Sequence, residues 1–155
     1  MLKLFKKKTA FVSPVEGKLK QLADVPDEAF ASKAMGDGFA IEPLESNIYS
    51  PVNGKVEFVF PTKHAVGIKT DDGIEILIHV GIETVSLNGE GFTLNVQEGQ
   101  VVKQGDLVIT ADFERIKDKV PATDVIVVFT NGKQCQLLKA GQRVSRTEKD
   151  IIKLF

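Results

Sequence analysis

The sequence predicts an all-β protein: an antiparallel β-sandwich or barrel-like domain with duplicated β motifs and one or two short helices. Most apolar residues stand in short segments of period two, and Gly, Asn or Asp residues separate these segments at close intervals. This arrangement is typical of sandwiches and barrels. A six-residue phrase also recurs, because residues 13–18 read SPVEGK and residues 50–55 read SPVNGK. The repetition predicts a β motif that is duplicated inside one domain.

The chain divides into a leader and one domain. We expect a flexible basic leader at residues 1–10 and a single domain over residues 11–155, which is long enough to bury a proper core. A weak amphipathic contact with an anionic membrane is the alternative interpretation of the leader. Its lysines are Lys3, Lys6, Lys7 and Lys8, and the apolar residues among them are Leu2, Leu4 and Phe5.

Two short segments have helix signals. In residues 26–35, Pro26 lies near the start, Asp27 and Glu28 favour the positive end of the helix dipole, and the following glycine can end the helix. A second helix is expected over residues 112–120, which a proline follows. The remaining apolar segments predict strands, after a first turn and strand within residues 11–22. These strands are residues 39–41, 48–60, 64–80 with an internal turn, 92–96, 107–111, 125–130, 134–138 and 151–154.

Composition excludes several classes of protein. The net charge is −1, which argues against a broad surface for nucleic acid or another polyanion. The single cysteine, Cys135, excludes an intrachain disulfide, fits a reducing compartment and is expected in the core. No apolar run approaches the ~18 residues of a membrane span, and no signal-peptide apolar region of ~7–15 residues is present. We therefore expect a cytoplasmic protein without stable membrane insertion.

Both histidines of the chain lie in one predicted β-hairpin. Residues 70–73 read TDDG, a turn pattern in which Asp tolerates turn geometry and Gly supplies a positive φ. A symmetric turn between the two aspartates pairs His64 directly with His79, with Cβ atoms roughly 4.5–5.5 Å apart. If Gly73 instead forms a bulge in a three-residue loop, the register shifts by one residue and this pairing is lost.

Two neighbouring imidazoles have a definite chemistry. Two cations at that distance repel, so at least one ring stays neutral near pH 7. A neutral imidazole has a nitrogen lone pair that can attack phosphorus or bind a metal. The second ring can donate a hydrogen bond to an oxyanion. The alternative is that the two histidines share a strand face and have no chemical role.

Other reaction classes lack their motifs. The sequence contains no P-loop, no dinucleotide-binding glycine turn, no CxxC, HxH or HExxH, and no recognisable nucleophile triad. A catalytic zinc site usually takes three protein ligands. His64 and His79 with Glu83 or Asp37 would supply that number, but no motif supports the set, and we expect no metal site.

Two long phrases, each containing one histidine, closely resemble the glucose-type enzyme IIA of the bacterial sugar phosphotransferase system, in wording nearest to its Gram-positive branch. The phrases are FPTKHA at residues 60–65 and EILIHVGIETVSL at residues 75–87. The resemblance runs from about residue 11 to the C-terminus, so that residues 11–155 resemble one EIIA type-1 domain. Further matching stretches are residues 24–27, 35–41, 88–92, 98–101 and 105–106.

The resemblance implies a phosphocarrier. Members of this family are antiparallel β-sandwiches with small helical segments. They accept a phosphoryl group from the phosphohistidine of the carrier protein HPr and pass it to a cysteine of a IIB domain, which phosphorylates the sugar entering through IIC. No cofactor is implied, because the donor N–P bond is already activated. We expect a monomer that visits the inner face of the membrane through the permease, and the sequence does not specify the sugar.

The same resemblance assigns roles to site residues. His79 is implied as the phosphorylated residue through Nε2, His64 as the group that hydrogen-bonds the phosphoryl group, and Thr62 as the residue that orients His64. A partner-docking apolar patch is expected from Phe39, Ile41, Ile78 and Val80, with the protein core as the alternative for each of them.

Two carboxylates are expected to frame the site. Asp37 and Glu83 would pair with arginines of HPr, and the alternative for each is a solvated turn residue. The family usually has Asp at the position of Glu83, so the carboxylate here is displaced by about one methylene.

Two rival functions belong to other classes. A zinc-dependent hydrolase would need a third metal ligand beside the histidines. A non-catalytic carrier or regulatory module is suggested by residues 102–107, VKQGDL, which resemble a strand motif of biotinyl and lipoyl domains. Those domains carry a modified lysine within a Met-Lys phrase, and this chain has no such phrase.

Overall fold

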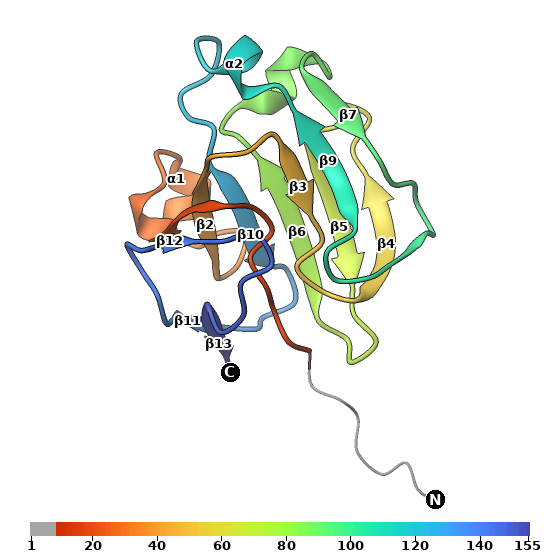
Figure 1. The fold of residues 1–155 in the computed structure, drawn as a ribbon, viewed down its shortest axis with the longest axis vertical. Coiled ribbons are helices and arrows are strands. Elements are labelled where there is room, and N and C mark those ends of the chain that lie inside the picture. Colours follow the sequence, from red (N-terminus) through yellow and green to blue (C-terminus); the bar gives the residue numbers. More distant parts are fainter. Residues whose placement is uncertain (1–8) are drawn as a thin grey trace, which may run out of the picture.

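The computed structural model describes residues 9–155, and antiparallel strands dominate it (Figure 1). An eight-stranded sheet has the order β12-β1-β2-β10-β6-β5-β4-β8. A three-stranded sheet, β3-β9-β7, and the pair β11-β13 complete the architecture. All the strand pairs are antiparallel. The expected all-β sandwich with two short helices is confirmed.

The strands are short, as the period-two segments predict. In chain order they are β1 Gly17–Gln21, β2 Gly38–Pro43, β3 Asn47–Tyr49, β4 Gly54–Val59, β5 Ala65–Lys69, β6 Glu75–Val80, β7 Phe92–Leu94, β8 Val101–Val102, β9 Leu107–Ala111, β10 Val125–Phe129, β11 Cys135–Leu137, β12 Arg143–Val144 and β13 Ile152–Leu154. The predicted strand 48–60 is two strands, β3 and β4, because the SPVNG turn interrupts it. The two-residue strands β8 and β12 were not predicted.

The helices are shorter than predicted. Helix α1 spans Glu28–Ala31, and the Asp27 side chain caps it by accepting hydrogen bonds from the next backbone amides. It ends early because Lys33 adopts a left-handed φ of 63°. Helix α2 spans Phe113–Ile116, with Asp112 as its N-cap. Two 3₁₀ turns, η1 Leu22–Asp24 and η2 Thr84–Leu87, complete the elements.

The repeated SPV phrases fold alike and lie side by side. The hydroxyl of Ser13 donates to the carbonyl of Val15, and the hydroxyl of Ser50 donates to that of Val52, each at 2.6 Å. Backbone hydrogen bonds join the two phrases, from Val12 N to Pro51 O and from Tyr49 N to Pro14 O. The duplicated sequence motif is therefore a duplicated turn at the centre of the fold.

The eight-stranded sheet has apolar residues on both faces. One face and the three-stranded sheet share the main core cluster, which includes Ile78, Ile109 and Phe129. The other face carries a smaller cluster, which includes Leu77 and Ile126 and is covered by Leu22, Val25 and Phe30 from the η1–α1 segment. Strand β10 and the first four residues of β2 are buried on both faces, and these two stretches have continuous apolar sequences.

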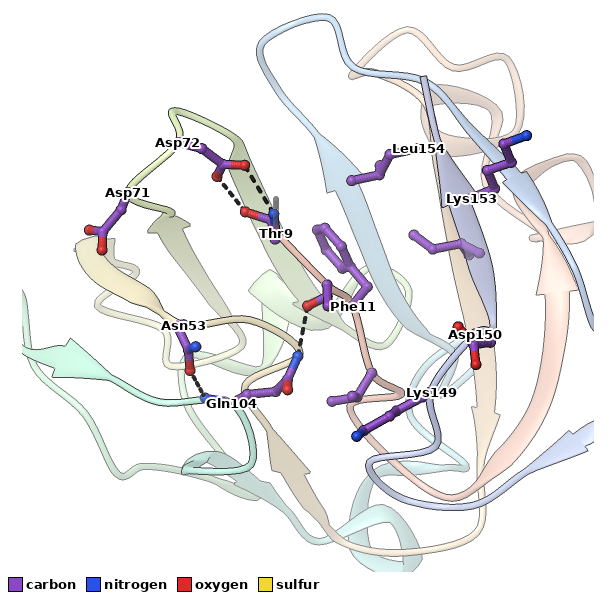
Figure 2. Close-up of a pocket in the computed structure, with 13 residues that line it drawn as sticks. Thr9, Phe11, Asn53, Asp71, Asp72, Gln104, Lys149, Asp150, Lys153 and Leu154 are labelled. Atoms are coloured by element: carbon purple, nitrogen blue, oxygen red, sulfur yellow. Dashed lines mark hydrogen bonds between the residues drawn. The ribbon is translucent and has the colours of Figure 1, made fainter. Parts of the chain in front are cut away.

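The predicted leader is partly integrated into the fold. Met1–Lys8 lie outside the described residues. Thr9 donates two hydrogen bonds to the Asp72 side chain, and the Gln104 side chain donates to the carbonyl of Ala10 at 2.7 Å (Figure 2). The last two residues of the predicted leader, Thr9 and Ala10, therefore form hydrogen bonds with the domain, and the boundary at residue 10 stays a prediction. Within the described residues, no helix has the length and apolar character needed to cross a membrane.

Removing the Phe129 side chain will destabilise the fold strongly. Phe129 is fully buried, and its ring makes an edge contact with Phe11 at 5.4 Å between centroids. Truncation to alanine leaves a cavity, so we expect Phe129→Ala to lower the free energy of unfolding by about 3–5 kcal/mol. Urea unfolding measures this difference. The matched control is Phe155→Ala at a 61% exposed position, which should stay within about 0.5 kcal/mol. Equal effects of the two substitutions would contradict the described core.

Candidate functional site

The histidine hairpin has a different register from the predicted one. Ala65, and not His64, lies opposite His79, and Lys69 pairs with Glu75. The cause is the turn, in which Thr70 N donates to Ile74 O and Gly73 has a φ of 89°. The loop therefore has three residues with glycine in the left-handed position, which shifts every pair by one residue.

The two imidazoles nevertheless lie against each other, with ring centroids 4.8 Å apart in an edge-to-face arrangement. In the observed register, a regular strand would place the His64 side chain on the opposite face from His79. However, β5 begins only at Ala65, and Lys63 has a left-handed φ of 65°. The turn before β5 takes His64 out of the strand alternation. The expected proximity is thus confirmed, although the pairing that led to it is wrong.

The two nitrogens of His79 have different surroundings. Nδ1 is buried and has no hydrogen-bond partner of ordinary geometry within the described residues. Nε2 is not fully buried, and no described residue forms a hydrogen bond with it. The side chain as a whole is partly exposed at the end of β6. Nε2 is therefore the nitrogen of His79 that an incoming group can reach.

Both histidines favour the neutral form. Burial lowers the pKa of His79 to about 4, with a further contribution from the neighbouring His64 ring. The Gly81 backbone and the Asp27 carboxylate act in the opposite direction but do not outweigh burial. Burial also lowers the pKa of His64, and Thr62 partly offsets this shift. At neutral pH the pair therefore retains nitrogen lone pairs, as nucleophilic attack requires.

Thr62 fixes the orientation of the His64 ring. The hydroxyl oxygen of Thr62 lies 2.8 Å from His64 Nδ1, a hydrogen-bond distance. His64 is 1% exposed, so its ring is held in place by the surrounding protein. Because Nδ1 has a partner, Nε2 is the nitrogen of His64 that remains free to interact with a substrate group.

Aromatic side chains surround the pair. The Phe60 ring lies 5.3 Å from that of His64, and the Phe30 ring lies 5.0 Å from that of His79. Phe30 comes from α1, whose N-cap is Asp27. Sequence reasoning did not assign Phe30, Phe60 or Asp27 to the site. The available signal was the Asp27 capping pattern, but nothing local showed that α1 packs against β6.

The predicted apolar docking patch is wrong. The side chains of Phe39, Ile41, Ile78 and Val80 are all fully buried in the main core cluster. They point away from the face that carries His79, since Ile78 and Val80 alternate with it along β6. No partner can reach them without unfolding the sheet, so the core alternative holds for all four.

The two predicted framing carboxylates have different positions. Asp37 is committed to the fold: it accepts a hydrogen bond from Cys135 N at 2.9 Å and pairs with Lys33 at 3.2 Å. Burial alone would raise the pKa of Asp37, but these interactions and the Gly38 amide lower it. Glu83 is exposed at the N-cap of η2, in the loop that follows His79. Of the two carboxylates, Glu83 is the more exposed, and its contact with a partner stays a prediction.

The zinc alternative lacks its third ligand. Among residues 9–155, no group of three or more His, Cys, Asp or Glu side chains is arranged to hold a metal ion. Asp37 and Glu83 do not join the histidines in such a group. Cys135 also gives no sign of activation, because burial raises the pKa of its thiol to about 12.

Neither histidine lines the pocket that Figure 2 shows. This cavity of about 700 Å³ lies between the tip of the β5–β6 hairpin at Asp71 and Asp72 and the C-terminal strand β13 (Figure 2). The histidines are at the other end of that hairpin.

A family model of the phosphoenolpyruvate-dependent sugar phosphotransferase system, EIIA 1, matches residues 9–135. The chain belongs to this family. The EIIA protein is also similar to a solved structure, the glucose permease IIA from Mycoplasma capricolum, with 40% sequence identity and a TM-score of 0.88. The similarity covers 96% of this chain and 97% of that one. The protein is thus an EIIA component of the glucose family in the sugar phosphotransferase system.

The stability of the EIIA protein will fall between about pH 6.5 and pH 4. The pKa of His79 is about 4 in the folded protein and about 6.5 in an unfolded chain. Between these values only the unfolded state binds the proton, so the free energy of unfolding decreases as the pH falls, by up to about 3 kcal/mol. Above pH 6.5 the contribution is fully present.

Urea unfolding at pH 7.5 and pH 4.5 tests this prediction. Carboxylates also titrate in this range, so the comparison is with His79→Gln, in which the His79 contribution is absent. The wild type should lose more stability than the variant on acidification. The same loss in both proteins would show that burial does not depress the pKa of His79.

Proposed function

We propose that this protein is the phosphocarrier that accepts a phosphoryl group from phospho-HPr on His79 and passes it to a cysteine of a IIB domain during sugar uptake. The observation that carries the proposal is the contact between two neutral imidazoles, one with an accessible Nε2 and the other anchored by Thr62. Membership in the EIIA family supports the choice of both partners.

His79 has the properties of the nucleophile. Its depressed pKa keeps the ring neutral at physiological pH, and its buried Nδ1 directs reactivity to Nε2. With a proton on Nδ1, the Nε2 lone pair attacks phosphorus in line. The N–P bond of the donor breaks and its electron pair stays on the donor imidazole, so no proton needs to move.

His64 stabilises the transferred group. If the Thr62 hydroxyl donates to Nδ1, the proton of the neutral ring is on Nε2 and can be donated to an equatorial phosphoryl oxygen. Phosphoryl transfer depends mainly on positioning and on charge stabilisation. The buried, hydrogen-bonded His64 supplies both without reorganising during the reaction.

In the second transfer, His79 is the leaving group and no longer the nucleophile. A cysteine thiolate of the IIB domain attacks the phosphorus, an S–P bond forms, and the N–P bond to His79 breaks. The electron pair returns to Nε2, which restores the starting state. Because each step exchanges one activated phosphoryl bond for another, the chain's own residues need only to hold the group and exclude misaligned attack.

Phosphopeptide mapping tests the proposal. The protein is incubated with phosphoenolpyruvate, enzyme I and HPr and then analysed by mass spectrometry under alkaline conditions. We expect one acid-labile phosphate per chain, located on His79. A phosphate on another residue, or none in a reaction in which HPr itself is phosphorylated, would reject the proposal.

A further inference from the structure

The backbone ladder between the two histidine-bearing segments lacks one hydrogen bond at its end. The Val80 amide donates to the His64 carbonyl at 2.8 Å. In a regular antiparallel pair, the His64 amide would donate back to the Val80 carbonyl. Within the described part of the chain it does not, because the left-handed turn at Lys63 comes directly before His64 and interrupts the pairing. The carbonyl of the residue after His79 therefore needs a donor from elsewhere.

The Thr84 hydroxyl is that donor. It donates to the Val80 carbonyl at 2.7 Å, and Thr84 is fully buried. A buried carbonyl without a partner is costly, so the hydroxyl replaces the missing bond of the ladder. Val80 is the last residue of β6, whereas Thr84 is the first residue of η2. The hydroxyl therefore closes the loop between these two elements.

The methyl group of Thr84 makes a second contact within this loop. Gly81 has a φ of 81°, and a Cβ atom added to it would come within 2.4 Å of the Thr84 methyl carbon. The methyl group therefore fills the space over Gly81. Because the Gly81 amide also donates to the Asp124 carbonyl at 2.7 Å, the loop is tied to the segment before β10. Both branches of the Thr84 side chain thus fix the loop that follows His79.

We infer that Thr84 is a positioning residue for phosphoryl transfer, because its hydroxyl holds the end of β6 where the His79 ring meets His64. The inference rests on the proposed function. Thr84 acts through Val80 and Gly81, the two residues that follow His79, and it is itself buried out of reach of a substrate. The Gly81 backbone in turn acts on the His79 ring, whose pKa it raises. Transfer requires reacting atoms about 3–3.5 Å apart and in line, and a misplacement of about 1 Å can cost 10²-fold in rate.

Thr84→Val tests the hydroxyl, because valine keeps a methyl group over Gly81 and removes the donor. The initial rate of His79 phosphorylation is measured against the concentration of phosphorylated HPr. We expect kcat to fall about tenfold, since the ring is less well aligned for attack. The KM should stay within about twofold, because a buried residue does not contact the donor protein. An unchanged kcat, or a raised KM at unchanged kcat, would overturn the inference.

Thr84→Ser is the conservative variant, because serine keeps the hydroxyl and loses only the methyl group. We expect it to retain most of the wild-type kcat. The ¹⁵N NMR signals of the His79 ring should move in Thr84→Val and stay close to those of the wild type in Thr84→Ser. If Thr84→Val does not fold, Thr84→Cys takes its place, since a thiol has nearly the shape of the serine hydroxyl but is a weak donor. A Thr84→Ser variant as slow as Thr84→Val or Thr84→Cys would assign the effect to packing over Gly81 and overturn the inference.

Thr70→Val is the matched control for a general loss of stability. Thr70 lies at the other end of the same hairpin, is 4% exposed, and its hydroxyl accepts a hydrogen bond from the Ile74 amide at 2.9 Å. We expect Thr70→Val to lower the urea midpoint of unfolding, as Thr84→Val does, but to leave kcat and the His79 ring signals unchanged. If Thr70→Val slows phosphorylation as much as Thr84→Val, the loss follows from destabilisation and the inference is overturned.

The outcomes separate this inference from the proposed function. If the wild type takes up no phosphate on His79, the proposed function fails and the inference fails with it. If the wild type is labelled on His79 and Thr84→Val is phosphorylated at the wild-type rate, the inference alone is overturned.

Discussion

His79→Gln will take up no acid-labile phosphate from phospho-HPr. Glutamine is similar in size to histidine and can remain in the partly exposed position at the end of β6, but its amide nitrogen has no lone pair available for attack. The rate of phosphoryl acceptance should fall by at least about a thousandfold, because removal of a nucleophile abolishes the step that depends on it. Mass spectrometry of the intact protein measures the remaining label.

The control for this prediction is a measurement that the His79→Gln variant remains folded. Urea unfolding at pH 7.5 should give a similar free energy of unfolding for wild type and His79→Gln, since the ring of His79 is neutral at that pH. A labelled His79→Gln with the phosphate on His64 would show that the two rings have exchanged roles. A labelled variant with phosphate elsewhere would reject the histidine pair as the phosphoryl site.

His64→Gln will accept phosphate but pass it on slowly. Acceptance goes to completion because excess phosphoenolpyruvate drives it, even when the rate is reduced. Transfer to the cysteine of the IIB domain should slow by about 10²–10³-fold, the usual effect of removing one preorganised donor to a developing charge. Rapid-quench measurement of the loss of label after the IIB domain is added checks the rate. A rate equal to that of the wild type would mean that His64 does not contact the transferred group.

Thr62→Val separates the orientation of His64 from its chemistry. Valine has the shape of threonine but no hydroxyl, so His64 Nδ1 loses the partner that lies at 2.8 Å. We expect a smaller loss, about tenfold, and an altered tautomer ratio of His64 in ¹⁵N NMR spectra. An unchanged tautomer ratio together with slowed transfer would indicate that Thr62 acts through packing only.

Local patterns were sufficient to predict the architecture. The TDDG turn between two apolar segments produced the expected hairpin, and because both histidines belong to that hairpin, their proximity followed from neighbouring parts of the chain. Likewise, the Asp27 cap and the SPV phrases act through hydrogen bonds within a few residues. Such features depend on short-range interactions, which the order of residues specifies directly.

The details of the site depended on longer-range packing. The sequence allowed two turn types at Gly73, and only the folded hairpin selected the three-residue loop that pairs Ala65 with His79. The burial of Phe39 and Ile41 was equally undetermined, because a strand covered on both faces has no polar alternation that could reveal its orientation.

By itself, the sequence determined the β architecture, the two-histidine hairpin and the motifs by which the chain resembles its family. The tertiary structure decided which group from elsewhere in the chain completes the site, because α1 brings the Phe30 ring against His79. It also decided that His79 stays neutral, since the depression of its pKa comes from burial by segments far apart in the chain. Burial and cross-strand contacts form between segments that are far apart in the sequence, so no single segment contains both of the contacting groups.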